Sequence, residues 1–250
     1  MKNNKQLHKT GFYPGIYNYC DRICELCNKR DNCVNYVMEK KLEEKGIDLT
    51  DMNFQEHSGV GEYLKNLISV LDEIIVDIAK ERNVEPDDIY MSEKITKYMY
   101  SDNNFTDYVE IDDEIDIFRI CSIYNSMMRE LLDCVFAKYD EDKVMDADYR
   151  LKLEDALFYV ENYGNLINER LREAVSNNKK GNKAVADSNG FAKIALLIID
   201  TSMESWTFIK TYLWSKRKAV DNILVVLRQL KSDVSVLYPD AMNFQRPGLD

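Results

Sequence analysis

The sequence predicts an all-α protein, an up-down helical bundle with an N-terminal cysteine-rich metal-binding segment. Only 9 Gly and 4 Pro occur in 250 residues, well below average usage, whereas strand-rich folds need both residues at frequent turns. No proline lies between Pro86 and Pro239, which leaves a long stretch suited to helices. Hydrophobic residues make up 45% of the chain, enough for a packed core.

Apolar residues at helical spacing place the individual helices. The first is expected over residues 34–45 and is stopped by Gly46. The second is expected over residues 58–82, with Ser58 as its N-cap. After a polar, acidic stretch (residues 83–111), further helices are expected over residues 112–138, 147–175, 188–213 and 216–237, with a surface loop over residues 176–188.

The helix over residues 147–175 has the most regular pattern of all. Its apolar seam consists of Leu153, Leu157, Val160, Gly164, Ile167, Leu171 and Ala174. Short links between most helices predict antiparallel neighbours and therefore an up-down bundle. We divide the chain into residues 1–46, the cysteine segment with a short helix, and residues 47–250, the bundle. We expect the two to form one compact unit.

The net charge of −11 is distributed unevenly along the chain. Residues 1–30 hold six basic and only two acidic side chains, so the acidic excess lies in the remainder. Nucleic-acid binding is not expected, because it draws on clustered Lys and Arg. No apolar stretch follows the N-terminal lysines, and the most apolar run, residues 194–199, is far too short to span a bilayer. We expect a cytoplasmic protein with a protein partner and no membrane partner.

Four of the six cysteines lie close together near the N-terminus. Cys20, Cys24, Cys27 and Cys33 have the spacing C-x3-C-x2-C-x5-C. Thiolates this close repel one another unless a cation neutralises them, and cytosolic proteins seldom use clustered cysteines for disulfides. The nearby bases Arg22, Lys29 and Arg30 favour the thiolate form. The four cysteines are therefore the predicted metal ligands.

Two occupants suit four thiolates. A [4Fe–4S] iron–sulfur cluster is held by compact runs of cysteines, and this is the occupant we favour. A Zn²⁺ ion also takes four thiolates, although structural zinc sites commonly use two separated cysteine pairs. A reduced or disulfide-forming group is the third alternative. The aromatic residues Phe12, Tyr13, Tyr17, Tyr19 and Tyr36 are expected to form an apolar shell around this segment.

The remaining sequence offers little chemistry. Cys121 and Cys134 fall on different sides of one expected helix, so both are expected to be buried packing residues. His8 and His57 are the only histidines, which argues against di-iron carboxylate sites and against catalysis that depends on a histidine base.

One expected helix carries charges within an apolar run. Lys193, Asp200 and Glu204 interrupt the stretch 187–206, where unpaired charges are costly to bury. They are candidates for the lining of a ligand pocket. They are also compatible with an ion pair to a neighbouring helix or with a narrow polar edge facing solvent.

Three stretches together support a resemblance: YNYCDRICELC (17–27), DSNGFAKIALLIID (187–200) and MNFQRPGLD (242–250). They resemble an uncharacterised bacterial family of helical proteins with an N-terminal cysteine cluster. The resemblance implies that the cysteine cluster and the helix around Lys193 and Asp200 serve the same function. It implies no particular activity.

The sequence leaves three functional hypotheses. The first is an iron–sulfur protein for electron transfer, redox sensing or support of a partner enzyme. The second is a non-enzymatic interaction protein with a structural zinc site. The third, weaker hypothesis is an enzyme with a carboxylate-lined pocket in the bundle.

Overall fold

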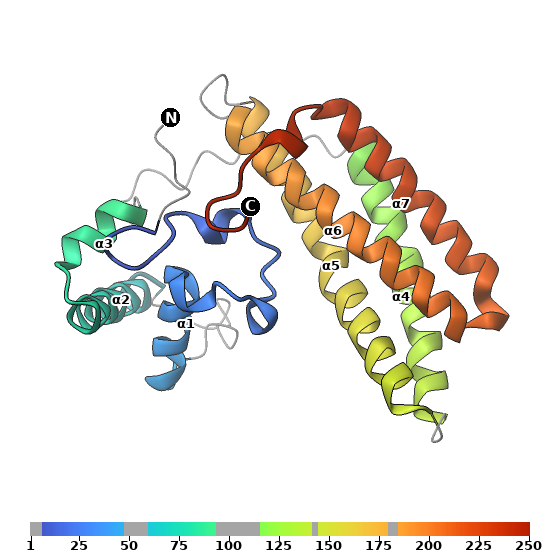
Figure 1. Ribbon diagram of the computed structural model, residues 1–250, viewed down its shortest axis with the longest axis horizontal. Helices are drawn as coiled ribbons and strands as arrows, with labels where there is room; N and C mark the ends of the chain where they lie inside the picture. Colours follow the sequence, from blue (N-terminus) through green and yellow to red (C-terminus); the bar gives the residue numbers. More distant parts are fainter. Residues whose placement is uncertain (1–6, 48–59, 94–115, 142–144, 180–184) are drawn as a thin grey trace. The chain divides into compact units, whose positions relative to one another are not determined.

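All regular elements in the part of the chain that is described are helical, which confirms the all-α prediction. The structure is a computed structural model that describes residues 7–47, 60–93, 116–141, 145–179 and 185–250 (Figure 1). It divides into two compact units, residues 1–108 with 245–250 and residues 109–244. None of the described helices combines the length and the apolar character that a bilayer crossing requires.

The second unit is a four-helix bundle. It consists of α4 (Asp116–Glu141), α5 (Ala147–Lys179), α6 (Val185–Tyr212) and α7 (Arg217–Leu237), with one-turn helices η4 (Trp214–Lys216) and η5 (Ala241–Asn243). The α5–α6 contact is the most extensive, and α4 and α7 each pack on two neighbours. Successive helices run in opposite directions (Figure 1), which is the expected up-down order.

The core of the bundle follows the predicted seam of α5. All seven seam positions are buried, from Leu153 to Ala174. At Gly164 a Cβ atom would lie 2.6 Å from the Sδ and Cε atoms of Met128, so the missing side chain makes room for that methionine. Next to this contact, the fully buried Trp206 donates its indole N–H to the Tyr124 hydroxyl at 3.3 Å.

The loop expected over residues 176–188 is shorter than predicted. α5 continues to Lys179 and α6 begins at Val185, while residues 180–184 lie outside the described part. Asn, Ser and Lys cost a helix only a few tenths of a kcal/mol each, and packing against a partner helix overrides so small a preference. The sequence tract SNNK was therefore wrongly assigned to the loop.

The first unit combines three α-helices with three one-turn helices. These are η1 (Ile16–Tyr19), η2 (Cys24–Leu26), η3 (Arg30–Asn32), α1 (Val34–Glu44), α2 (Val60–Arg82) and α3 (Pro86–Glu93). Their shared core is formed by Phe12, Val34, Leu42, Ile74, Ile75, Ile78, Ala79 and Ile89. α1 and α2, which lie on either side of residue 46, thus pack around a single core.

Two helices in this unit end at residues with a left-handed backbone conformation. Gly46 has φ 74° and ends α1 as predicted, and the N–H of Ile47 closes the turn on the Leu42 carbonyl at 2.9 Å. Asn83 has φ 54° and ends α2 in the same way. The predicted N-cap Ser58 lies outside the described residues.

α3 falls in a stretch that sequence patterning left without a helix. Pro86 occupies its first position, where a missing N–H costs nothing, and Asp87 and Asp88 favour a helix N-terminus. Ile89 anchors the helix in the core with no exposed surface. Eight residues are too few to show a periodic apolar pattern, which is why this helix was missed.

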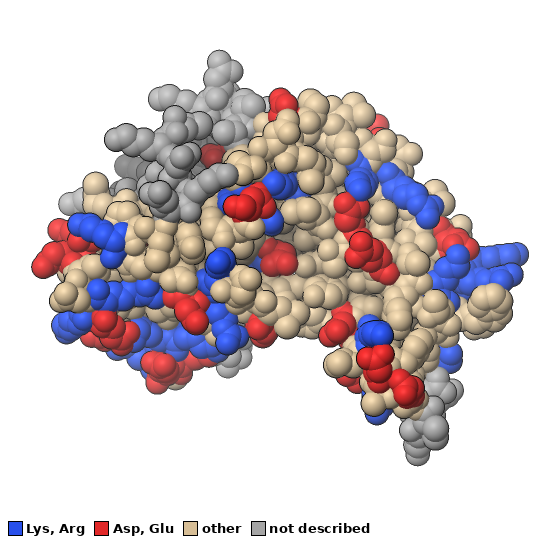
Figure 2. Space-filling model, in the orientation of Figure 1, with Lys and Arg blue, Asp and Glu red and all other residues tan. Residues whose placement is uncertain are grey.

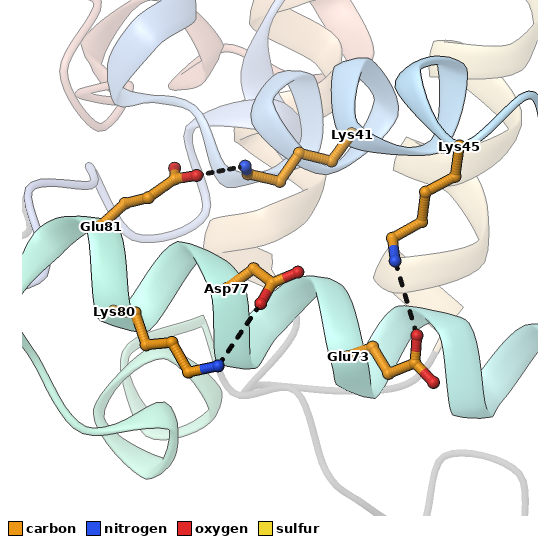
Figure 3. Close-up of polar contacts among 6 residues, drawn as sticks. All are labelled: Lys41, Lys45, Glu73, Asp77, Lys80 and Glu81. Carbon is orange, nitrogen blue, oxygen red and sulfur yellow. Dashed lines mark hydrogen bonds and ion pairs between the residues drawn. The ribbon is translucent and has the colours of Figure 1, made fainter.

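Ion pairs line the contact between α1 and α2. They join Lys41 to Glu81 at 2.6 Å and Lys45 to Glu73 at 3.5 Å, and within α2 they join Lys80 to Asp77 at 3.7 Å (Figure 3). Such partly exposed pairs contribute about 0–1 kcal/mol each. The apolar core therefore provides most of the stability of this contact.

Candidate metal centre

The four clustered cysteines lie at the junctions of the short helices. Cys20 follows η1, Cys24 opens η2, Cys27 ends η2, and Cys33 joins η3 to α1. Between Cys20 and Cys24 the backbone turns through Arg22, which has φ 58°, a left-handed conformation that few non-glycine residues adopt. The segment is thus a series of tight turns, each of which ends at a thiol.

These turns bring the four thiols into one neighbourhood. Burial, followed by the charges of Cys20 and Cys33, raises the pKa of Cys24 to about 12. Burial also raises the pKa of Cys33, and the charges of Cys20 and Cys27 act in the same direction. All four side chains are half-buried.

Main-chain N–H groups point at two of the sulfurs. The N–H of Lys29 donates to the Cys27 sulfur at 3.4 Å. The N–H groups of Asn35 and Tyr36, in the first turn of α1, hydrogen-bond the Cys33 sulfur and oppose the rise in its pKa. The Cys20 thiol instead donates to the Tyr17 carbonyl at 3.6 Å. N–H donors to sulfur stabilise negative charge on thiolates and on metal-bound sulfur.

The described side chains do not form a complete metal site. Among the described residues, no group of three or more His, Cys, Asp or Glu side chains is placed to hold a metal ion. Thiols with raised pKa values stay protonated at neutral pH, and metal binding must displace these protons. The chemistry of the donor set nevertheless suits a thiophilic metal, because four thiols and three N–H donors to sulfur lie in one segment.

Arg82 anchors the cysteine segment to α2. Its guanidinium donates to the carbonyls of Thr10, Gly11 and Asp31 at 3.3, 2.9 and 2.6 Å. It also lies over the Phe12 ring, 3.8 Å from the ring centroid. One side chain therefore holds both the N-terminal turn and the η3 turn. Nothing in the sequence singled out this arginine, since it is one base among many.

Glu93 is a second residue that sequence patterning missed. Its side chain is buried, with Oε2 accepting the N–H of Gly15 at 3.0 Å and Oε1 without a partner among the described residues. Burial raises the pKa of Glu93. Burial and then the charges of Glu93 and Cys33 raise the pKa of Tyr17. Glu93 therefore belongs to the surroundings of the thiols.

The aromatic residues near the cysteines have different roles. Phe12 is fully buried and Tyr17 packs against the same core, as expected of an apolar shell. Tyr36 lies beneath the cations of Arg30 and Lys40, at 5.9 and 5.8 Å. Phe12 and Tyr17 are thus packed as predicted for an apolar shell, whereas Tyr36 contacts charged side chains.

The last residues of the chain also pack against this segment. At Gly248, with φ 69°, a Cβ would lie 2.6 Å from the Tyr13 ring, so only glycine allows the approach. Arg246 and Asp250 close the tail with a two-nitrogen ion pair, at 3.0 Å from Nε and 2.8 Å from Nη2. The first unit therefore contains both ends of the described chain.

The three pocket candidates in α6 make separate contacts. Lys193 is buried, and its Nζ donates to the Phe244 carbonyl at 2.7 Å. Asp200 pairs with Lys231 of α7 at 2.5 Å, and Glu204 is exposed. The Asp200 contact is the ion pair to a neighbouring helix, and the exposed Glu204 is the polar edge, that the sequence predicted as alternatives to a pocket.

The two other cysteines lie in α4, and they differ from each other. Cys121 is buried, as predicted, and burial raises its pKa to about 12. Cys134 is only half-buried, so the expectation of full burial was wrong for this residue. It sits between Leu131 and Val135, which face the core, and it occupies the edge of the apolar stripe.

Comparison with known proteins gives no relative for this chain. No protein-family model matches it, and neither the curated proteins nor the solved structures contain a significant match.

Proposed function

We propose that Cys20, Cys24, Cys27 and Cys33 hold a [4Fe–4S] cluster, and that the protein serves electron transfer, redox sensing or the support of a partner enzyme. The observation that carries this proposal is the gathering of four thiols in a segment of tight turns, with N–H donors on two of the sulfurs. A cluster whose irons are all bound by protein supplies electron transfer rather than an open metal position. We place this chemistry in the cytoplasm, where thiols stay reduced.

In this proposal the residues of the chain set the stability of the charged site. The N–H groups of Lys29, Asn35 and Tyr36 compensate negative charge on sulfur, and half-burial limits the access of water. Arg82 joins the turn at Gly11, before the cysteines, to the η3 turn at Asp31, between Cys27 and Cys33. Replacement of Arg82 should therefore weaken the site without removing a ligand.

A structural zinc site is the second candidate. It is favoured by the absence, between residues 16 and 33 of the described chain, of any helix longer than one turn. Segments that are built only of turns bury little apolar surface, and a metal commonly stabilises them. In this case the protein would be an interaction module without redox chemistry.

Anaerobic purification distinguishes the two candidates. The iron–sulfur proposal predicts a brown protein with about four iron and four acid-labile sulfide per chain. A colourless protein with one zinc per chain would replace it by the zinc proposal. A protein that binds neither metal after reconstitution would contradict both.

A matched pair of variants tests the ligands. Cys27→Ser should abolish the metal stoichiometry, while Cys134→Ser should leave it unchanged, because Cys134 lies in α4 of the other unit. Retained metal in Cys27→Ser would show that the ligand set is different. Circular dichroism of both variants checks that the bundle is folded.

A further inference from the structure

An exposed tryptophan lies at the turn between α6 and α7. Trp214 is 68% exposed, whereas the other tryptophan, Trp206, is fully buried in the bundle. All five residues from Trp214 to Lys218 are exposed. We call these residues, Trp-Ser-Lys-Arg-Lys, the basic tip. An exposed indole forgoes the large gain of burial and offers an apolar ring with one N–H donor to a partner.

The basic tip carries three consecutive positive charges. Lys216, Arg217 and Lys218 form no ion pair with any residue that the structure describes. Blue side chains gather at the end of the bundle where α6 meets α7 (Figure 2). The Arg217 guanidinium lies 4.5 Å from the Trp214 ring centroid, so charge and indole form one surface.

Neighbouring bases at this end of the bundle serve the fold instead. Lys210 pairs with Asp221 at 2.5 Å, and Lys138 donates to the Tyr212 carbonyl at the end of α6 at 2.6 Å. The contrast shows that the bases of the tip are not needed for these structural contacts.

The position of the three bases is locally unfavourable. They precede and open α7, whose first turn holds no acidic residue and whose N-cap side chain makes no hydrogen bond. Positive charge at a helix N-terminus opposes the helix dipole, usually by several tenths of a kcal/mol. Residues that break a local rule without a structural gain commonly serve binding.

We propose that the basic tip binds the surface of a membrane that contains anionic phospholipids. An indole has an apolar body and one N–H donor and is favoured at the headgroup level, while Lys and Arg beside it meet lipid phosphates and carboxylates. The sequence argument against membranes concerned spanning segments, and contact with a membrane surface needs none. The binding rests on few charges and one ring, so it is weak and reversible.

The short length of the basic tip favours lipid over nucleic acid. The tip is a single turn with three bases in a row, whereas nucleic-acid sites follow several phosphates along a groove. At physiological salt, charges more than about 8 Å from the surface are largely screened, so a tip at the end of long helices meets a membrane without the acidic remainder of the bundle.

The test measures binding to lipid vesicles with the full-length protein. Vesicles of phosphatidylcholine and phosphatidylserine in equal parts should sediment with the protein, and pure phosphatidylcholine vesicles should not. The Trp214 emission should shift to shorter wavelength on binding. Trp214→Phe should abolish the shift, because Trp206 is already buried. Added salt should release the protein.

A charge-matched pair of variants gives the control. Replacing Lys216, Arg217 and Lys218 together by Gln should lower vesicle affinity more than about tenfold. Replacing the exposed bases Lys40, Lys80 and Arg119 together by Gln removes the same charge elsewhere and should leave affinity unchanged.

Three outcomes would overturn the proposal. These are equal binding to neutral vesicles, no binding to either vesicle, and binding to a single-stranded oligonucleotide or to polyglutamate without binding to vesicles. None of them bears on the cysteine site, which lies in the other unit.

Discussion

The two units of this protein are stabilised by different kinds of contact. In the bundle, long helices bury apolar residues at regular intervals, as in the α5 seam from Leu153 to Ala174. In the first unit, a small apolar core is supplemented by single polar side chains that reach main-chain atoms far away in sequence, as Arg82 does at Gly11 and Glu93 does at Gly15. Loss of a seam residue leaves a cavity, whereas loss of one of these polar side chains leaves a main-chain group without its partner.

This difference decides how each unit should respond to substitution. Both tryptophans, Trp206 and Trp214, belong to the bundle, so tryptophan fluorescence reports that unit alone. Hydrogen exchange of peptides from residues 7–47 and from α2 reports the first unit. With both signals, each variant can be assigned to the unit that it affects.

The largest effect is expected in the bundle core. Leu171→Ala removes a fully buried side chain of α5 and should lower the free energy of unfolding by about 2–5 kcal/mol. Leu151→Ala, on the same helix but 58% exposed, should cost less than about 0.5 kcal/mol. Chemical denaturation followed by tryptophan fluorescence measures both. Equal costs would mean that the seam is not the core.

Arg82→Met should have nearly as large an effect, confined to the first unit. It leaves three carbonyl groups without their shared donor, which should cost about 3 kcal/mol. Peptides from residues 7–47 should lose protection from hydrogen exchange while tryptophan fluorescence stays native. In the exposed control Arg119→Met neither signal should change. Loss of both signals in Arg82→Met would contradict the independence of the two units.

A smaller, pH-dependent effect is expected at Glu93. Burial raises its pKa in the folded state, so its contribution to stability is complete below about pH 4.5 and is lost as the pH rises through the folded pKa. Glu93→Gln keeps the acceptor for the Gly15 N–H but cannot ionise. The variant should therefore gain stability over the natural protein as the pH approaches neutrality.

Denaturation of the first unit at several pH values measures this difference. Glu204→Gln, a change at an exposed position of α6, is the control and should follow the natural protein. A Glu93→Gln protein with the same pH profile as the natural one would show that Glu93 is charged in the fold.

The smallest effect is expected at the ion pair between α6 and α7. Asp200 and Lys231 are 42% and 40% exposed, so Asp200→Asn should cost no more than about 1 kcal/mol, and added salt should reduce that cost. Thermal unfolding at low and high salt measures it. A cost several times larger would show that the pair is shielded from water, in the manner of a buried charge.

Much of the bundle could be predicted from sequence because its determinants are periodic. The seam of α5, the burial of Cys121 and the end of α1 at Gly46 follow from spacing and from local backbone preference. The four cysteines were found in the same way, since their spacing is itself the signal. Their expected metal remains a prediction.

The sequence pattern did not reveal the residues that hold the first unit together. Arg82, Glu93 and Gly248 act through contacts with residues 51 or more positions away, and each acts alone. An isolated residue has no period, and the hydrogen-bond partners of Arg82 and Glu93 are main-chain atoms that any residue could supply. The same reasoning explains α3, which is too short for its apolar positions to repeat.

The packing of Gly248 against Tyr13 has a consequence for the order of synthesis. A ribosome makes Tyr13 before the bundle and Gly248 after it, and folding during translation proceeds from the N-terminus. The bundle, residues 109–244, is therefore translated in full before the first unit can acquire its final contact. The cysteine segment is thus made before the bundle, and it acquires its contact with Gly248 only after the bundle has been made.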